Sequence, residues 1–191
     1  MLRRERFFEL FPEVDTISDA ELKESCYRSF ADAVESGGWD EESMMRAPCA
    51  VHGFKNTPVT GIMHIQDAVR LCTMICDYLL EHYGQYVPCN RDFVIAGAVL
   101  HDIGKFIEYR ITDDGEPYDS AEANYLRHPL AGAIIASRNG VPKEVVHIIA
   151  THSFEGKNSY ASVESTIVKS TETIPQKFIG FVFGTDELNI S

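Results

Sequence analysis

The sequence Ala98-Val-Leu-His-Asp-Ile-Gly-Lys105 sets a histidine directly before an aspartate, at the end of a strongly apolar segment that begins at Phe93. The apolar spacing is that of a buried helix, and Gly104 is typical of the place where such a helix ends. We therefore expect an imidazole and a carboxylate at the end of a helix in the core. A charged carboxylate is costly to bury unless a partner such as a metal ion pairs with it. An ordinary helix C-terminus, which favours a histidine near its negative end, is the alternative.

The composition limits the class of protein. The 191 residues suffice for one domain with a sizeable core, and the hydrophobic content of 45% is that of a globular protein. The net charge of −12 argues against long nucleic acid as a partner, because no basic stripe is available to bind it. A small anionic substrate stays open, since bound metal ions reverse the charge locally.

The cysteines and the N-terminus bear on the compartment. Five cysteines, an odd number without a Cys-x-x-Cys pair, indicate reduced thiols rather than a disulfide framework. The apolar runs are too short for a membrane span, and the basic start lacks the apolar middle of a signal peptide. We expect a cytoplasmic protein without a membrane contact.

Residues 1–50 are predicted to form a helical appendage ahead of a metal-binding helical domain at residues 51–191. One helix is expected over residues 3–11, and another from Ser18 as its N-cap to about Glu35. No residue of this segment points to a chemical role. We interpret it as a packing element or as the surface of a homodimer.

Three further histidines stand at ends of predicted helices. His64 lies in the first turn of a long helix, where the positive helix end favours the neutral imidazole that binds metal. His128 directly precedes Pro129, and proline is favoured in the first turn of a helix. His152 ends an apolar helix that starts near Pro142. These histidines are our candidate metal ligands together with the His-Asp pair.

The other histidines are weaker candidates. His52 competes with His64 for the role of first ligand, but it lies in a loop that no element fixes. His82, near the end of a helix, is expected at the surface. His147 precedes His152 by five residues, which places it on another helix face, and we expect it to be structural.

The segment after the His-Asp pair is expected to form a short β-hairpin flap, or a loop, over the site. Asp114-Gly115 is a hairpin signal. Lys105 and Arg110 are candidates to bind a phosphate, with a solvated surface role equally open. A last helix is expected over residues 161–172, followed by an apolar tail that packs on the core.

Imidazole and carboxylate groups together suit zinc and first-row transition metals. With these residues the chain resembles the HD-domain metal-dependent phosphohydrolase superfamily. The matching residues are His64, His101-Asp102 within His-Asp-Ile-Gly-Lys, His128 and His152. The resemblance covers roughly residues 60–175 and implies an all-α helical bundle.

The resemblance also implies a ligand arrangement. Asp102 would bridge two metal ions, with His64 and His101 on one and His128 and His152 on the other. It implies one or two divalent metal ions per chain and leaves open whether they are Fe, Mn, Zn, Co, Ni or Mg.

The last ligand departs from the pattern of the superfamily, which closes with an Asp late in a helix. Glu172 falls at the matching place in this sequence. Glu164 is a weaker alternative. The longer side chain of a glutamate changes the reach of the carboxylate toward the first metal ion.

The function that the resemblance implies is a metal-dependent phosphohydrolase for a small phosphorylated metabolite or nucleotide, acting through a metal-bound hydroxide. Asp102 and Lys105 are the predicted catalytic residues, and Lys105 and Arg110 the predicted substrate-binding residues. Two alternatives stay open. An iron-dependent oxygenase or oxidase can use the same ligand set, and the missing final Asp would suit a nucleotide-binding regulator without turnover.

Overall fold

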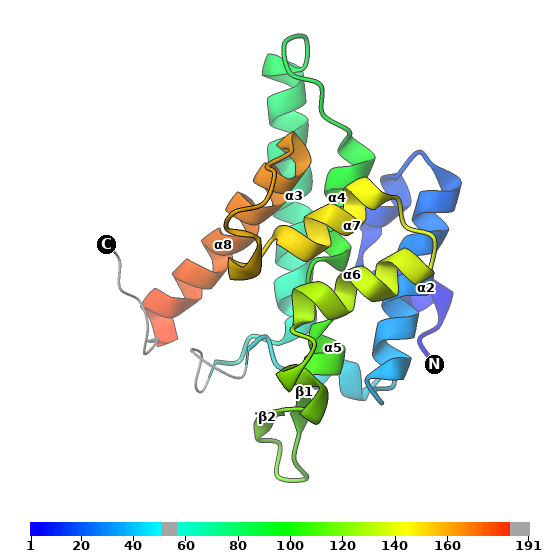
Figure 1. The fold of residues 1–191 in the computed structure, drawn as a ribbon, viewed down its shortest axis with the longest axis vertical. Coiled ribbons are helices and arrows are strands. Elements are labelled where there is room, and N and C mark those ends of the chain that lie inside the picture. The colour runs from blue at the N-terminus through cyan, green and yellow to red at the C-terminus, as the bar shows by residue number, and fades with distance from the viewer. Residues whose placement is uncertain (51–56, 184–191) are drawn as a thin grey trace.

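The structure, a computed structural model, describes residues 1–50 and 57–183. Its elements in chain order are α1 (Arg4–Leu10), the 3-10 turn Pro12–Thr16, α2 (Ala20–Ser36), the 3-10 turn Ser43–Arg46, α3 (Gly61–Tyr83), α4 (Arg91–Leu100), α5 (Lys105–Glu108), β1 (Tyr109–Ile111), β2 (Pro117–Asp119), the 3-10 turn Ala121–Asn124, α6 (His128–Arg138), α7 (Lys143–Thr151), the 3-10 turn Phe154–Gly156 and α8 (Val163–Phe183). The predicted all-α fold is confirmed, because helices form the body and the described residues add one two-stranded sheet (Figure 1). No helix in these residues is long and apolar enough to cross a membrane.

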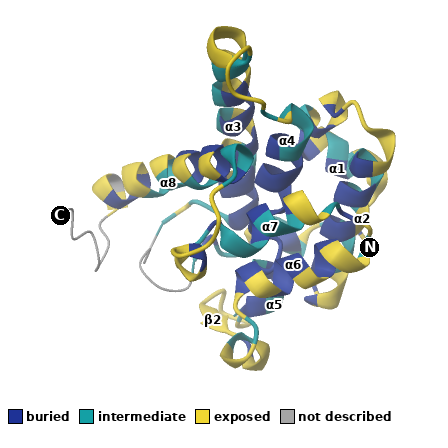
Figure 2. Cartoon of the chain, turned by 45° about the horizontal axis from the view of Figure 1, so that its top comes forward, coloured by how far each residue is buried: buried dark blue, intermediate teal, exposed yellow. Residues whose placement is uncertain are grey.

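Helix α4 is the centre of the fold. Residues 94–100 are all buried, and α4 packs against α2, α3, α7 and α8 (Figures 1 and 2). Gly97 permits the close approach of α7, because a Cβ at this position would lie 2.8 Å from the side chain of Ile148. Burial on every side accounts for the apolar run of the sequence. It also delivers His101 and Asp102 to the middle of the molecule.

Polar side chains fix where the helices begin. The side chain of Asn90 accepts hydrogen bonds from the backbone N–H groups of Asp92 and Phe93 at the start of α4. The hydroxyl of Thr60 accepts one from Met63 at the start of α3. Such caps satisfy N–H groups that have no partner within the helix. The caps therefore hold the first turn of α3, which carries a candidate ligand.

The start of α2 corrects one sequence expectation. Asp19, not Ser18, is the N-cap, and its carboxylate accepts the backbone N–H groups of Glu21 and Leu22. The hydroxyl of Ser18 instead donates to Oδ2 of Asp92 at 2.5 Å. Asp and Ser cap helices about equally well, so the tertiary contact with α4 decides between the two neighbours.

The N-terminal helices share the hydrophobic core with the rest of the chain. The rings of Phe11 and Phe30 lie 5.1 Å apart between centroids, and Phe30 lies 5.4 Å from Phe106. Nε1 of Trp39 donates to the carbonyl of Phe106 at 2.9 Å. The segment thus packs directly against the residue after Lys105. The division of the chain at residue 50 and the homodimer stay predictions.

The predicted hairpin is present. Strands β1 and β2 are antiparallel, with Arg110 paired to Tyr118. Gly115 stands in the turn with a φ of +88°, a conformation that glycine adopts without strain. The hairpin projects from one end of the helical body (Figure 1).

Helix α8 is longer than the sequence suggests. It continues through Pro175 to Phe183 and leaves the body of the molecule (Figure 1). The expectation that the apolar tail packs on the core holds for Ile179, which is buried, and fails for Phe178 and Phe181, which are 69% and 68% exposed. The expected helix end at residue 172 is wrong, because the helix accommodates a proline that usually ends or kinks one.

Candidate metal centre

The carboxylate of Asp102 lies among four imidazoles. Its Oδ2 is 3.1 Å from Nε2 of His64 and 3.3 Å from Nε2 of His101. Its Oδ1 is 3.5 Å from Nε2 of His128 and 3.4 Å from Nε2 of His152. All five side chains are buried. Each carboxylate oxygen therefore faces its own pair of imidazoles.

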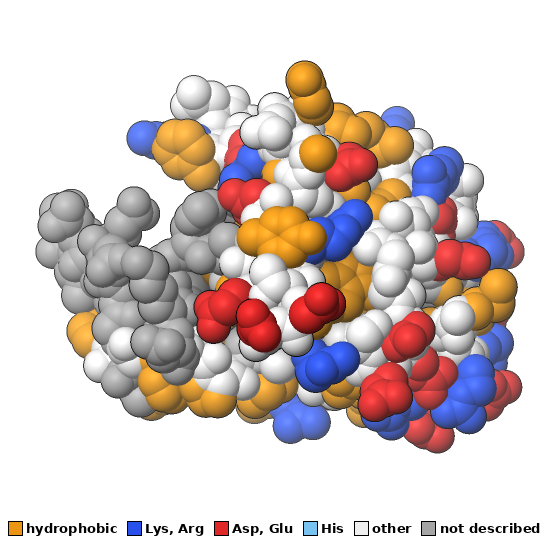
Figure 3. Space-filling model, turned by 90° about the horizontal axis from the view of Figure 1, so that it is seen from below, with side chains coloured by type: hydrophobic (Ala, Val, Ile, Leu, Met, Phe, Trp, Pro, Cys, Tyr) orange, Lys and Arg blue, Asp and Glu red, His pale blue; other side chains and the backbone are white. Residues whose placement is uncertain are grey.

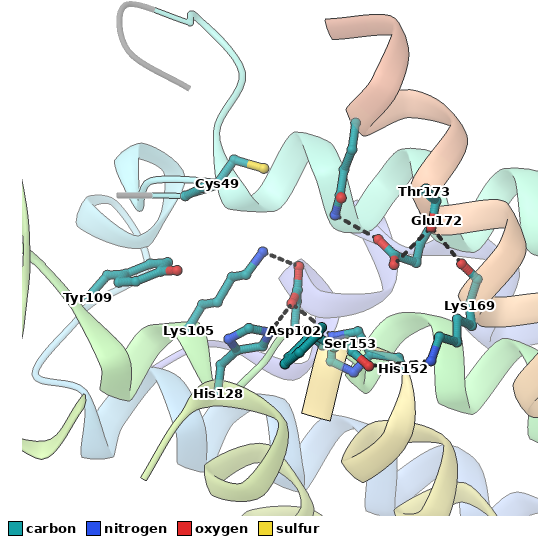
Figure 4. A pocket seen from close by; sticks show the side chains of 13 residues that line it. Cys49, Asp102, Lys105, Tyr109, His128, His152, Ser153, Lys169, Glu172 and Thr173 are labelled. Atoms are coloured by element: carbon teal, nitrogen blue, oxygen red, sulfur yellow. Dashed lines mark hydrogen bonds and ion pairs between the residues drawn. The ribbon is translucent and has the colours of Figure 1, made fainter. Parts of the chain in front are cut away.

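Helix ends position these residues. His64 lies in the first turn of α3, and His128 is the first residue of α6. His101 and His152 directly follow α4 and α7. Asp102 occupies the turn between α4 and α5, and Figure 4 shows His128 and His152 pointing toward it. Segments far apart in sequence thus converge on one carboxylate.

Three of the imidazoles have a fixed tautomer. Nδ1 of His101 is 2.7 Å from the carbonyl of Ala98, and Nδ1 of His152 is 2.8 Å from the carbonyl of Ile149. A carbonyl oxygen only accepts hydrogen bonds, so Nδ1 carries the proton in both rings. Nδ1 of His128 donates in the same way to a carboxylate, at 2.7 Å. In the neutral rings Nε2 is then an acceptor that faces the acceptor oxygens of Asp102.

The charges of the site follow from burial and from neighbours. Burial lowers the pKa of His64 and of His128 below the ordinary value for histidine. Burial opposes ionisation of Asp102, but Lys105 and His101 outweigh it and hold the pKa of this carboxyl well below its usual range. The same carboxylate raises the pKa of His101 against the effect of burial. The centre therefore combines an anionic carboxylate with two rings that favour the neutral form.

This arrangement fits a metal ion. Oδ1 of Asp102 and Nδ1 of His64 are buried without a hydrogen-bond partner among the described residues. Acceptor atoms that face one another at hydrogen-bond distance are unfavourable unless a proton or a cation lies between them. Imidazole nitrogen and carboxylate oxygen are ligands that zinc and first-row transition metals prefer. Ligand atoms gather in two groups of three, each within 4.8 Å. The groups are His64, His101 and Glu172, and Asp102, His128 and His152.

Of the two glutamates considered for the last ligand, the structure brings Glu172 to the site. Its Oε2 lies 3.8 Å from Nε2 of His64 and accepts a hydrogen bond from Nε2 of Gln176 at 2.7 Å. Glu164 lies elsewhere, where it accepts the backbone N–H of Asn90. A role of Glu172 as a metal ligand stays a prediction.

The HD domain family model matches residues 62–174, which is more than half of the chain. The chain belongs to the HD domain family. The resemblance noted from the His-Asp-Ile-Gly-Lys segment and the spaced histidines is thereby confirmed. All six residues of the two groups lie inside the matched part of this HD domain.

Several characterised proteins are similar to this HD domain over part of their length. A dihydroneopterin 2',3'-cyclic phosphate phosphodiesterase of Methanocaldococcus jannaschii is 35% identical over 112 residues, 58% of this chain and 43% of that protein. A tRNA (cytidine(56)-2'-O)-methyltransferase of Picrophilus torridus is 26% identical over 121 residues, 62% of this chain and 29% of that protein. A ribonuclease Y of Chloroflexus aurantiacus is 28% identical over 99 residues, 52% of this chain and 16% of that protein. The chain thus spans less than half the length of each relative. No solved structure matches it.

Lys105 and Arg110, the two predicted substrate-binding residues, differ in their distance from the metal centre. Nζ of Lys105 is 2.6 Å from Oδ2 of Asp102, beside the site. Arg110 does not reach the site, because its guanidinium donates to the carbonyls of Phe106, Ile107 and Tyr109 at the end of α5. Arg110 does not line the cavity above Asp102. Its role in substrate binding stays a prediction.

The remaining histidines lie apart from the centre. His147 hydrogen-bonds through Nε2 to the carbonyl of Tyr160, away from the site, in line with a structural role. His82 lies on the exposed part of α3 and bonds to the carbonyl of Tyr78. His52, the competing first ligand, lies outside the described residues.

A cavity of about 330 Å³ opens over Asp102 (Figure 4). Beside the predicted residues it is lined by Cys49, Ala50, Tyr109, Ser153, Phe154, Lys169, Thr173 and Gln176. The predicted flap contributes only Tyr109 to this lining.

The polar residues of α8 that line the cavity could have been found in the sequence. Lys169, Glu172, Thr173 and Gln176 recur at the spacing of one helix face. An expected helix end at residue 172 hid this pattern.

Proposed function

We propose that this HD domain hydrolyses a phosphate ester of a small molecule with divalent metal ions held around Asp102. One observation carries the proposal: each oxygen of a single buried carboxylate faces two imidazole Nε2 atoms, at 3.1 to 3.5 Å. The relative from Methanocaldococcus jannaschii, a cyclic phosphate phosphodiesterase by name, supports the reaction class.

The proposed division of ligands follows the two groups of the structure. One ion would be held by His64, His101 and Glu172, and the other by Asp102, His128 and His152. Oδ2 of Asp102, which faces His64 and His101, would be available to the first ion as well. When bound, such ions supply Lewis acidity toward a phosphoryl oxygen and lower the pKa of water. The fixed Nδ1 protons of three rings keep their Nε2 atoms free to ligate.

Two lysines line the cavity and differ in their partners. Lys105 pairs with Asp102 at 2.6 Å, so its positive charge is largely neutralised there. Nζ of Lys169 lies 3.4 Å from the carbonyls of Thr151 and Ser153 and has no carboxylate partner among the described residues. We propose that Lys105 keeps Asp102 ionised and borders the substrate. Lys169 is the cation that binds the substrate phosphate.

The dimensions and charge of the molecule favour a small substrate. A cavity of about 330 Å³ is at the lower end of the range for small-molecule sites. The face seen in Figure 3 intersperses basic and acidic side chains and shows no continuous basic stripe over the described residues. A phosphorylated metabolite or a nucleotide fits these features better than a long nucleic acid.

The state of the cysteines bears on the cellular compartment of the protein. All five cysteines are free thiols. We propose a cytoplasmic protein on that ground, because free thiols persist in a reducing compartment.

Metal counting joined to an activity screen tests the proposal. Protein purified without chelator is analysed for metals per chain and assayed on bis(4-nitrophenyl) phosphate and on 2',3'-cyclic nucleotides, with Asp102→Asn as the control. Two ions of manganese, cobalt, nickel or zinc with turnover of an ester support the proposal. Two iron ions with oxygen uptake and no ester hydrolysis would replace it with an oxygenase. Bound metal without any turnover would point to a nucleotide-binding regulator.

A further inference from the structure

Glu108 carries a fully buried carboxylate beside the metal centre and has no role in the proposed function. It is the last residue of α5 and is 0% exposed. Its Oε2 accepts two hydrogen bonds from His128, from the backbone N–H at 2.7 Å and from Nδ1 at 2.7 Å. One carboxylate oxygen thus holds both the first backbone N–H of α6 and the ring of its first residue.

This partner distinguishes His128 from the other rings with a fixed tautomer. His101 and His152 donate from Nδ1 to carbonyls within their own helices, of Ala98 and Ile149. Those carbonyls are held by the helix itself and add no charge. His128 begins its helix, so no preceding turn offers it a carbonyl. A side chain from α5 takes that place.

The second oxygen of Glu108 explains how the charge is kept in the core. Oε1 lies 2.9 Å from NH1 of Arg127 and forms an ion pair with it, without a hydrogen bond. Arg127 also lies 3.5 Å from Oε1 of Glu155, in the turn that follows His152. A buried carboxylate persists in charged form only with such a partner. Arg127 therefore stabilises the anion that accepts both bonds from His128.

We infer that Glu108 is the positioning residue of His128: it holds the proton on Nδ1 and directs the Nε2 lone pair toward Asp102. The part of the inference that concerns metal affinity rests on the proposed function. A carboxylate behind a ligating imidazole fixes its orientation and increases its basicity, and losing such a partner lowers metal affinity by about 10- to 100-fold.

A glutamine at this position cannot replace the carboxylate. With the amide oxygen toward His128, the amide N–H groups face the guanidinium of Arg127, donor against donor. With the amide turned around, its N–H groups face the two N–H donors of His128. Glu108→Gln therefore keeps the size of the side chain but places two donors against each other, either at Arg127 or at His128. Glu155→Gln, which removes an ion-pair partner of Arg127 but no hydrogen bond of His128, is the matched control.

The first measurement needs no metal. ¹⁵N NMR of the histidine side chains in metal-free protein is expected to show His128 with its proton on Nδ1, and the same form in Glu155→Gln. In Glu108→Gln a mixture of tautomers is expected. A ring with its proton on Nε2 in the unmutated protein would overturn the inference, even if Glu108→Gln failed to fold.

In the second measurement, the metal-free proteins are titrated with Co²⁺ and binding is measured by calorimetry. One of two binding events should weaken by about 10- to 100-fold in Glu108→Gln, with the other event and both events of Glu155→Gln unchanged. Equal affinities in Glu108→Gln and unmutated protein would refute the inference. Absence of Co²⁺ binding in the unmutated protein would refute the proposed function instead, and the NMR result would then decide the tautomer alone.

Discussion

Replacing Gly104 with alanine tests whether the turn after α4 positions the site. A Cβ on Gly104 would lie 2.0 Å from the carbonyl oxygen of His128 and 2.8 Å from the backbone nitrogen of Gly132. Ordinary contact begins near 3.4 Å, so α6 would have to retreat by 3.4 − 2.0 = 1.4 Å. Because both neighbours are backbone atoms, no side chain can move aside instead. His128 is the first residue of α6, so its ring would move with the helix.

The expected cost is at the upper end for an overpacked core, about 3 kcal/mol. At about 2–4 °C per kcal/mol for a chain of this length, Tm falls by about 6–12 °C. Thermal unfolding gives the stability, and metal analysis should show at most one tightly bound ion. Gly115→Ala is the control, because a Cβ added at Gly115 would meet no atom within 4 Å and only the backbone, with its φ of +88°, would be strained. Strain alone should cost about 1–2 kcal/mol there. A smaller loss in Gly104→Ala than in Gly115→Ala would refute the packing argument.

Three further changes have sharp outcomes. Asp102→Asn should abolish binding of both metal ions and the activity, and metal retained at two ions per chain in elemental analysis would contradict a bridging role. Glu172→Gln should weaken the binding of one metal ion only. An unchanged metal count and turnover would show that Glu172 is not a ligand. Asp32→Asn tests a surface contact: the hydrogen bond from Arg138 holds the pKa of Asp32 below its ordinary value. The contact between Asp32 and Arg138 therefore stabilises the fold by about 0.5–1 kcal/mol at pH values above the pKa of Asp32 in the unfolded chain, about 4. This stabilisation is lost as the pH falls through the pKa of Asp32 in the folded protein. Urea unfolding should show a smaller difference in stability between the two proteins at pH 3 than at pH 7.

The parts of the site that the sequence predicts are those with a local cause. Helix boundaries depend on caps, prolines and glycines within a few residues, and these signals place His64, His128 and His152 at helix ends. Lys105 lies one turn after Asp102 and reaches it for the same local reason. The buried run of α4 is visible because a helix surrounded on all sides is apolar on all sides.

The parts that escape prediction depend on contacts between distant segments. Glu108 looks like any polar residue at the end of a short helix, and only the approach of α6 makes it the partner of His128. Arg110 has the right charge and a near position, but its guanidinium bonds to backbone carbonyls and does not line the cavity. Pro175 suggests a helix end, yet α8 continues past it and presents Gln176 to the cavity.

The glutamate at position 172 is compatible with a ligand role because its neighbours restrain it. A glutamate has one more rotatable bond than an aspartate, so an unrestrained one loses more conformational freedom on binding. Here Gln176, one turn further along α8, donates to Oε2 at 2.7 Å, and the side chain is 7% exposed. The added length also lets a carboxylate on α8 come within 3.8 Å of Nε2 of His64. The same helix face that carries Lys169 thus holds the carboxylate in place, which ties the assigned phosphate-binding residue and the assigned last ligand to one rigid element.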